Sequence, residues 1–383
     1  MKTVSARFFS LTLPWVVPRQ QGHTLIPLFI PFSGCPVRCV FCAQDVQTGL
    51  AACMDAATPA AAAPVLPAST LANLLDQARE NLESRSARGL PPAELAFYGG
   101  TFTAMPLPEQ SACLDLAQEA LERGWIHSFR CSTRPDCVDA PVLARLRAAG
   151  CGCVELGVQS FANEALVASK RGYDGKTALR ACALVKEAGL TLGVQLLPGM
   201  PGHTPAEFLD DVPLALAAGA DMLRFYPCLV LEGTALARMW RQGLYSPWGL
   251  EDTLNCLARG WLLAQKAGVP VIRMGLAPEA SLDAAVLAGP VDAALGSRVM
   301  ARALLLAVRQ QLEQMPAAST AAPAPTVAAQ PVLRALCVPP SCQGYVWGLR
   351  GELRLAWANL GLPPGGLTFD PACGQTLRLT VAI

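Results

Sequence analysis

The chain has 383 residues, of which 52% are hydrophobic and 15% charged, and its formal net charge at pH 7 is +1. That length allows one large domain with a small one beside it, and that composition excludes an intrinsically disordered chain. The balanced charge gives no global electrostatic reason to bind nucleic acid or an anionic membrane.

The amino-terminal segment is the first place to look for a targeting signal. An apolar run at 8–17 follows basic residues, but Pro14 and Pro18 interrupt it and no A-x-A cleavage site follows. The charge-free stretches at 57–75 and 315–333 are each broken by several prolines, so neither predicts a membrane span. We expect a cytoplasmic protein with no membrane partner.

Strand patterns and helix patterns alternate from residue 23 onward. Strands are predicted at 24–31, 94–98, 126–132, 153–158, 191–197 and 221–226. The clearest helices between and after them are predicted at 71–82, 107–123, 140–149 and 205–218. Six βα units of this kind indicate a parallel sheet with right-handed crossovers, and hence an α/β protein with a partial (β/α)6 TIM-like barrel.

Composition divides the rest of the chain. Residues 51–67 are rich in Pro and Ala and predict an exposed insertion, whereas 269–274 predicts a further strand outside the set of six. After a linker of mostly Ala, Pro, Ser and Thr, a helix near 345–360 and a strand at 375–381 predict a small α+β unit. The predicted organisation is an extension (1–22), a core (23–278), a helical segment packing on the core (279–315), the linker (316–331) and the small carboxy-terminal unit (332–383).

Fifteen cysteines are many, and an odd number, for a chain that does not need disulfides to build its core. Most stand singly among Ala, Val and Leu, and we interpret residues such as Cys113, Cys182 and Cys256 as small buried hydrophobic side chains.

Three cysteines are different, because they form the C-x3-C-x2-C run Cys35-Pro-Val-Arg-Cys39-Val-Phe41-Cys42 directly after the first predicted strand. Three thiolates this close together can hold three irons of a [4Fe–4S] cluster and leave the fourth iron open to a small molecule. The alternatives are structural zinc, which wants four ligands, and coincidental core cysteines. No second C-x2-C pair is present to complete a zinc site.

Other informative residues also fall at predicted strand ends, where parallel α/β folds bind ligands. The second strand ends in Gly99-Gly100-Thr101, and two adjacent glycines let the backbone approach a ligand closely. Glu155, Gln159 and Gln195 are polar residues in otherwise apolar strands. Each is a candidate ligand contact, with structural hydrogen bonding as the equal alternative for any one of them.

Taken together, these motifs resemble the radical S-adenosylmethionine (SAM) superfamily over about 23–278 of the chain. The resemblance is to the branch of the Elongator catalytic subunit and of oxygen-independent coproporphyrinogen III oxidase. It implies that Cys35, Cys39 and Cys42 ligate a [4Fe–4S] cluster. The other cofactor-binding residues that it implies are Phe41 near the adenine of SAM, Gly99, Gly100 and Thr101 at its methionine group, and Ser132, Gln159, Arg171 and Gln195 at its ribose or carboxylate.

The reaction that the resemblance implies is reductive cleavage of SAM to methionine and a 5′-deoxyadenosyl radical, which abstracts hydrogen from an unidentified substrate. A reductant such as flavodoxin or ferredoxin would be the electron donor, and the substrate would be a small molecule or an RNA. No further residue is assigned a catalytic role. The alternatives are a non-catalytic or ligand-delivery protein on the same fold, similar to a haem chaperone, and an RNA-modifying enzyme. Because no Q/R-x-x-G-x-G pyrophosphate loop is present after the linker, an acetyltransferase activity is not expected.

Overall fold

The computed structural model describes residues 8–18, 22, 24–30, 33–44, 68–276, 280–315 and 331–382. The predicted insertion, and all of the predicted linker except Pro331, lie outside these ranges. The chain divides into two compact units. The larger comprises Arg19–Thr253 and Val269–Val291, and the smaller comprises Met1–Pro18, Leu254–Gly268 and Asp292–Ile383. Among the described residues, no helix is both long and apolar enough to cross a bilayer.

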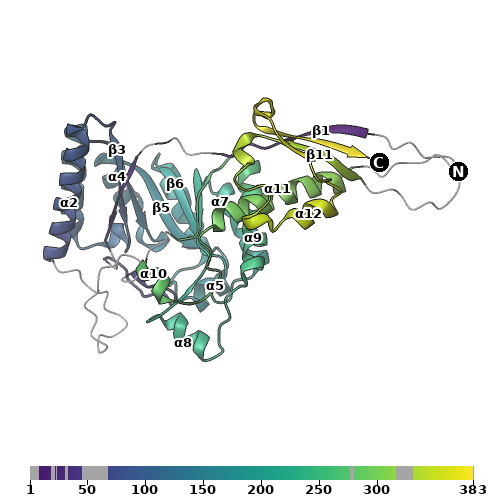
Figure 1. Cartoon of the computed structure of the whole chain (residues 1–383). Coiled ribbons are helices and arrows are strands. Elements are labelled where there is room, and N and C mark those ends of the chain that lie inside the picture. Colours follow the sequence, from purple (N-terminus) through teal and green to yellow (C-terminus); the bar gives the residue numbers. More distant parts are fainter. Residues whose placement is uncertain are drawn as a thin grey trace, which may run out of the picture. The chain divides into compact units, whose positions relative to one another are not determined.

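The larger unit is built on one sheet of seven parallel strands that curls into a half-barrel, which confirms the predicted partial TIM-like barrel (Figure 1). In spatial order the strands are β2 (Leu25–Phe29), β3 (Ala93–Tyr98), β4 (Ile126–Thr133), β5 (Cys151–Gln159), β6 (Thr191–Leu196), β7 (Met222–Phe225) and β9 (Val271–Met274). The first six are the predicted strands. The further strand predicted at 269–274 is present as β9, which pairs in parallel with β7 as the seventh strand of the same sheet.

Helices connect these strands, and several begin where a side chain caps the first turn. They are α2 (Ala68–Ala87), α3 (Leu107–Glu122), α4 (Ala140–Ala148), α5 (Asn163–Ala168), α6 (Gly175–Glu187), α7 (Pro205–Ala217), α8 (Ala235–Arg241) and α10 (Ala280–Ala285). Asp139 and Asp174 accept hydrogen bonds from the first turns of α4 and α6, and Thr204 forms a capping box with Glu207 at α7. A short antiparallel pair, β8 (Val230–Leu231) with β10 (Val286–Ala288), completes the described part of this unit.

The smaller unit contains a four-stranded sheet in the order β1-β13-β11-β12, formed by β1 (Phe8–Pro14), β13 (Thr376–Ala382), β11 (Val332–Val338) and β12 (Leu367–Phe369). β1 pairs antiparallel with β13, so a segment predicted only as an extension is a strand beside the last strand of the chain (Figure 1). The unit also contains α11 (Leu295–Glu313) and α12 (Arg354–Asn359), while α9 (Leu250–Lys266) begins in the larger unit and continues into this one.

The helix predicted near 345–360 is shorter in the structure, where only α12 is α-helical. Gly348 and Gly351 both have positive φ angles, of 69° and 79°, which end a right-handed helix. The apolar spacing that suggested one long helix therefore continues across a break that the glycines create.

A cluster of charged side chains in the smaller unit surrounds Glu352. Arg298 Nε and Arg302 Nη1 each donate to Glu352 Oε1 at 2.9 Å, and Asp292 forms a further ion pair with Arg298. Burial opposes the charged carboxylate, but the hydrogen bonds from Arg298 and then Arg302 outweigh burial and lower the pKa of Glu352 to about 2.

Because the pKa of Glu352 lies below its ordinary value of 4.5, this cluster should stabilise the smaller unit above pH 4.5. That contribution is lost as the pH falls from 4.5 towards 2, where the folded carboxylate becomes protonated. We expect the free energy of unfolding of a Glu352→Gln variant to fall less steeply than that of the wild type between pH 6 and pH 3. Urea denaturation across this range is the measurement, and parallel pH profiles for the two proteins would contradict the prediction.

Candidate functional site

The cysteine loop of the larger unit follows β2 and is fixed against the turn that follows β3. Thr101 N–H donates to Ser33 O at 2.7 Å, Gly100 N–H donates to Gln44 Oε1 at 3.0 Å, and the Cys35 thiol lies 3.3 Å from Thr101 Oγ1. The loop that carries the predicted metal ligands and the Gly-Gly-Thr turn predicted to bind a cofactor are therefore in direct contact.

Glycine is required at this contact because the two backbones approach too closely for a side chain. Gly100 has a φ of 51°, and a Cβ there would lie 2.3 Å from Ser33 O. At Gly34, where φ is 75°, a Cβ would lie 2.4 Å from Thr101 O. Backbone atoms cannot move aside as a flexible side chain can, so these glycines set the position of the cysteine loop.

Two buried guanidinium groups face the middle cysteine. Arg171 Nη1 donates to Cys39 Sγ at 3.0 Å, and Arg134 Nη1 lies 3.6 Å from the same sulfur while its other nitrogens bind Asp136. Tyr173 packs against both guanidinium groups, with its ring centroid 5.1 Å from Arg171 Cζ. The predicted cofactor-binding residue Arg171 thus lies directly beside a predicted metal ligand.

The electrostatics of the thiols follow from this position. Burial raises the pKa of the Cys35 thiol, and the hydrogen bond with Thr101 and the charges of Arg134 and Arg171 only partly oppose it. Burial likewise raises the pKa of Cys42. In the metal-free protein these groups are therefore neutral thiols at pH 7, and binding a metal here releases protons.

The three thiols supply the donor set that an iron–sulfur cluster takes. Cys35, Cys39 and Cys42 are free thiols on one loop. Three thiolates can hold three irons of a [4Fe–4S] cluster, whereas a structural zinc ion takes four ligands.

The other predicted cofactor residues line the carboxyl ends of the next strands. Ser132 lies at the end of β4 and Gln159 at the end of β5. Gln159 has a positive φ of 69°, uncommon for a residue with a side chain, and the pairing of β5 with β6 shifts register just before it. The Gln159 side chain packs beside Gly157. A Cβ on residue 157 would lie only 3.0 Å from Gln159 Nε2.

Below these strand ends, the sheet carries a buried network of charged side chains around Glu155. Arg224 Nε lies 2.7 Å from Glu155 Oε2, Arg130 Nη1 lies 3.1 Å from Oε1, and Tyr98 and Gln195 also donate to this carboxylate, at 2.8 and 3.0 Å. Burial opposes the charge of Glu155, but Arg224 above all outweighs it, so the pKa of Glu155 is lowered. Gln195, one of the predicted cofactor residues, is therefore joined through its amide nitrogen to this network.

Sequence reasoning identified Glu155 and Gln195 but missed Tyr98, Arg130 and Arg224, which lie on three other strands. Arg224 is a charged residue inside an otherwise apolar strand, and that signal would have found it. Arg130 has no such signal, because β4 also contains His127, two serines and a threonine. Gly193 makes room for the network, since a Cβ there would lie 2.8 Å from Glu155 Cγ.

Phe41 and Cys228 belong to the hydrophobic cluster under the cysteine loop. Phe41 packs, partly buried, against a core that includes Val40, Met200 and Leu236. Cys228 is a fully buried member of that core, and burial raises its pKa to about 12. Cys228 is therefore a core residue and not a thiol that faces a substrate.

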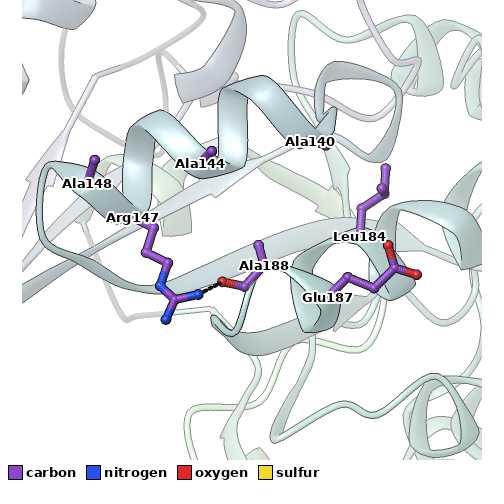
Figure 2. Close-up of a pocket in the computed structure, with 7 residues that line it drawn as sticks. All are labelled: Ala140, Ala144, Arg147, Ala148, Leu184, Glu187 and Ala188. Carbon is purple, nitrogen blue, oxygen red and sulfur yellow. Dashed lines mark hydrogen bonds between the residues drawn. The ribbon is translucent and has the colours of Figure 1, made fainter.

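A hollow of about 530 Å³ lies between α4 and α6 (Figure 2). Its lining residues are Ala140, Ala144, Arg147, Ala148, Leu184, Glu187 and Ala188. Arg147 reaches across it and donates to Ala188 O at 2.7 Å. The lining contains none of the predicted site residues and is mostly small and apolar, so the cysteine loop remains the candidate site.

Comparisons with known proteins agree with this location. Two family models match the chain, described as "Radical SAM superfamily" over residues 29–215 and "Radical_SAM C-terminal domain" over residues 220–304. A tRNA uridine(34) acetyltransferase from Methanocaldococcus infernus is 32% identical over 204 residues, which are 48% of this chain and 38% of that protein. Heme chaperone HemW from Mycobacterium tuberculosis is 29% identical over 234 residues, 60% of this chain and 56% of that protein.

Among solved structures, the archaeal Elp3 of Methanocaldococcus infernus superposes with a TM-score of 0.52 at 27% identity. The match covers 61% of this chain and 60% of that one. The chain thus spans about two fifths to three fifths of the length of these relatives.

Proposed function

Because the chain belongs to the radical SAM superfamily, we propose that it is an enzyme that cleaves SAM reductively at a [4Fe–4S] cluster. The observation that carries the proposal is the contact of the cysteine loop with the Gly99-Gly100-Thr101 turn at one end of the sheet. When bound, the cluster would supply the electron that splits SAM into methionine and a 5′-deoxyadenosyl radical.

The residues of this chain have separate tasks in the proposal. Cys35, Cys39 and Cys42 hold the cluster, and the turn of Gly99, Gly100 and Thr101 receives the methionine group of SAM. Phe41 packs near the adenine. The polar groups that receive the ribose or the carboxylate are Ser132, Gln159, Arg171 and Gln195.

Arg134 and Arg171 have a further task in the proposal, because both face Cys39. Two positive charges beside a ligand sulfur stabilise the negative charge of thiolates and of a reduced cluster. An external electron donor, such as a flavodoxin or a ferredoxin, would deliver the electron.

Two alternatives remain for the molecule that the protein binds or acts on. A relative named as a haem chaperone supports a protein that binds and delivers a ligand, and a relative named as a tRNA acetyltransferase supports action on RNA. We favour catalysis because Cys35 contacts the glycine turn and both arginines face Cys39, so the residues proposed for the cluster and for SAM lie together.

The test begins with anaerobic loading of the full chain with iron and sulfide, followed by dithionite and SAM. We expect about four irons per chain and formation of 5′-deoxyadenosine, detected by liquid chromatography and mass spectrometry. Haem and bulk transfer RNA are added in separate reactions. A loaded protein that binds haem but forms no 5′-deoxyadenosine, with or without cell extract, would instead support ligand delivery.

A matched pair of variants identifies the ligands. Alanine at Cys35, Cys39 and Cys42 should abolish both iron retention and 5′-deoxyadenosine formation. Alanine at Cys113, Cys182 and Cys256, three buried thiols elsewhere in the chain, removes the same number of sulfurs and should leave both intact. Retention of the cluster by the first variant would refute the ligand assignment.

A further inference from the structure

A second group of thiols lies in the smaller unit, in the carboxy-terminal sheet. Cys337 is on β11 and Cys373 ends the short 3-10 turn Pro371–Cys373 before β13, and their sulfur atoms are 3.1 Å apart. None of the described cysteines is in a disulfide. Two thiols already in contact need only about 1 Å of further approach to form a bond of about 2.05 Å.

The accessibility of the two thiols differs. Cys337 is partly exposed, between the buried neighbours Leu336 and Val338, so it lies on the outward side of its strand. Cys373 is only 3% exposed. A reagent in solution therefore meets Cys337 first, and Cys373 is the thiol held in position behind it.

A cation stands beside the pair. Arg378 is opposite Cys337 in the pairing of β11 with β13, and it forms an ion pair of 2.9 Å with Asp370, which precedes the turn that ends at Cys373. Asp370 also caps the turn by accepting from Ala372 N–H. Burial and the contact with Cys337 raise the pKa of the Cys373 thiol, and the charge of Arg378 opposes that rise. The charge thereby favours the thiolate, which is the form that attacks disulfides.

We propose that Cys337 and Cys373 form a reversible dithiol site whose reagent is a low-molecular-weight disulfide such as oxidised glutathione. The Cys337 thiolate attacks one sulfur of the reagent, which forms a mixed disulfide and expels one thiolate. Cys373 then attacks the Cys337 sulfur, forms the Cys337–Cys373 bond and expels the second thiolate. The two protein thiols lose two protons and two electrons, and the reagent gains the electrons as it becomes two thiols.

The same side chains could be considered for a metal ion, since Asp370 completes a set of three possible ligands. Two sulfurs bound tetrahedrally at about 2.3 Å from zinc would lie roughly 3.8 Å apart, farther than these two. The Asp370 carboxylate is already engaged by Arg378 and by the turn. The geometry therefore favours the dithiol.

The experiment uses the full chain, handled anaerobically, with and without its cluster. It is incubated with defined mixtures of oxidised and reduced glutathione, blocked with an alkylating reagent and digested with trypsin. We expect a disulfide between the peptides 335–350 and 355–378. Because the first peptide also contains Cys342, the Cys342→Ser variant must retain the link and the Cys337→Ser variant must lose it.

Two further measurements test the order of steps. The Cys373→Ser variant should accumulate glutathione on Cys337, since the second thiol is missing. Arg378→Gln should slow formation of the bond by about three- to tenfold. Cys131 and Cys151 serve as an internal control, because these neighbouring thiols are buried in the larger unit and should remain reduced.

The proposal is overturned if the 335–350 and 355–378 peptides stay unlinked in fully oxidised glutathione, or if the link passes through Cys342. It is also overturned if the purified chain carries a zinc ion that the Cys337→Ser variant loses. None of these readouts requires SAM cleavage, so the outcome is independent of the proposed function.

Discussion

Replacing Gly100 with alanine should abolish most of the cluster-dependent activity. The new Cβ would lie 2.3 Å from Ser33 O and 2.9 Å from Ser33 N, so the backbone of the cysteine loop must shift. A displacement of about 1 Å at a reacting centre can reduce a rate by roughly a hundredfold. We expect reduced retention of iron and sulfide, and about a hundredfold less 5′-deoxyadenosine.

Gly124→Ala is the matched control for this variant. Gly124 also has a positive φ, of 68°, but a Cβ there meets nothing within 4 Å. Both substitutions carry the left-handed backbone penalty of about 1 kcal/mol, which thermal unfolding would reveal. Only Gly100→Ala should lose iron. Equal iron content and equal activity in the two variants would show that the close approach does not position the loop.

Removing the charge of Glu155 should cost the protein much of its stability. Its carboxylate is 1% exposed and lies between Arg130 and Arg224, so Glu155→Gln leaves buried guanidinium charge without compensation. Breaking one partner of such a buried network typically costs about 3–5 kcal/mol. Urea denaturation at pH 7.5, followed by circular dichroism, is the measurement.

Glu232→Gln provides the control with the same change of chemistry. Glu232 pairs with Arg241, but about half of each side chain is exposed. Exposed pairs contribute about 0–1 kcal/mol, because water and salt screen the charges. Similar losses in the free energy of unfolding for the two variants would mean that the Glu155 network does not stabilise the half-barrel.

The half-barrel was predictable because each strand and helix carries its own periodic pattern. The place of β9 was not, since its four residues are only half-buried and its partner β7 lies about 45 residues earlier. The strand β1 was not predicted either, because its partner strand is also distant in the sequence. Its partner β13 is at the other end of the chain, and nothing within Phe8–Pro14 indicates that pairing.

The candidate site was likewise predictable only in part. The cysteine run and Gly99-Gly100 are local motifs, so their chemistry is visible in the sequence. The contacts between them, and the approach of Arg134 and Arg171 to Cys39, arise from segments up to 132 residues apart. Gln195 shows most clearly what the sequence alone does not reveal. Its polarity in an apolar strand was noted, but only the fold shows that its amide nitrogen binds Glu155.

The pairing of β1 with β13 constrains how the protein is made. The paired strands are separated by 361 residues, because Pro14, the last residue of β1, lies opposite Thr376, the first of β13. At about 5–20 residues per second, a ribosome needs roughly 20–70 s to synthesise that interval. Throughout this time β1 has no partner strand, whereas the half-barrel is completed about 100 residues before β13 and can fold first. The smaller unit is therefore completed last, and a nascent chain stalled before Thr376 would carry an unpaired strand that other chains could capture.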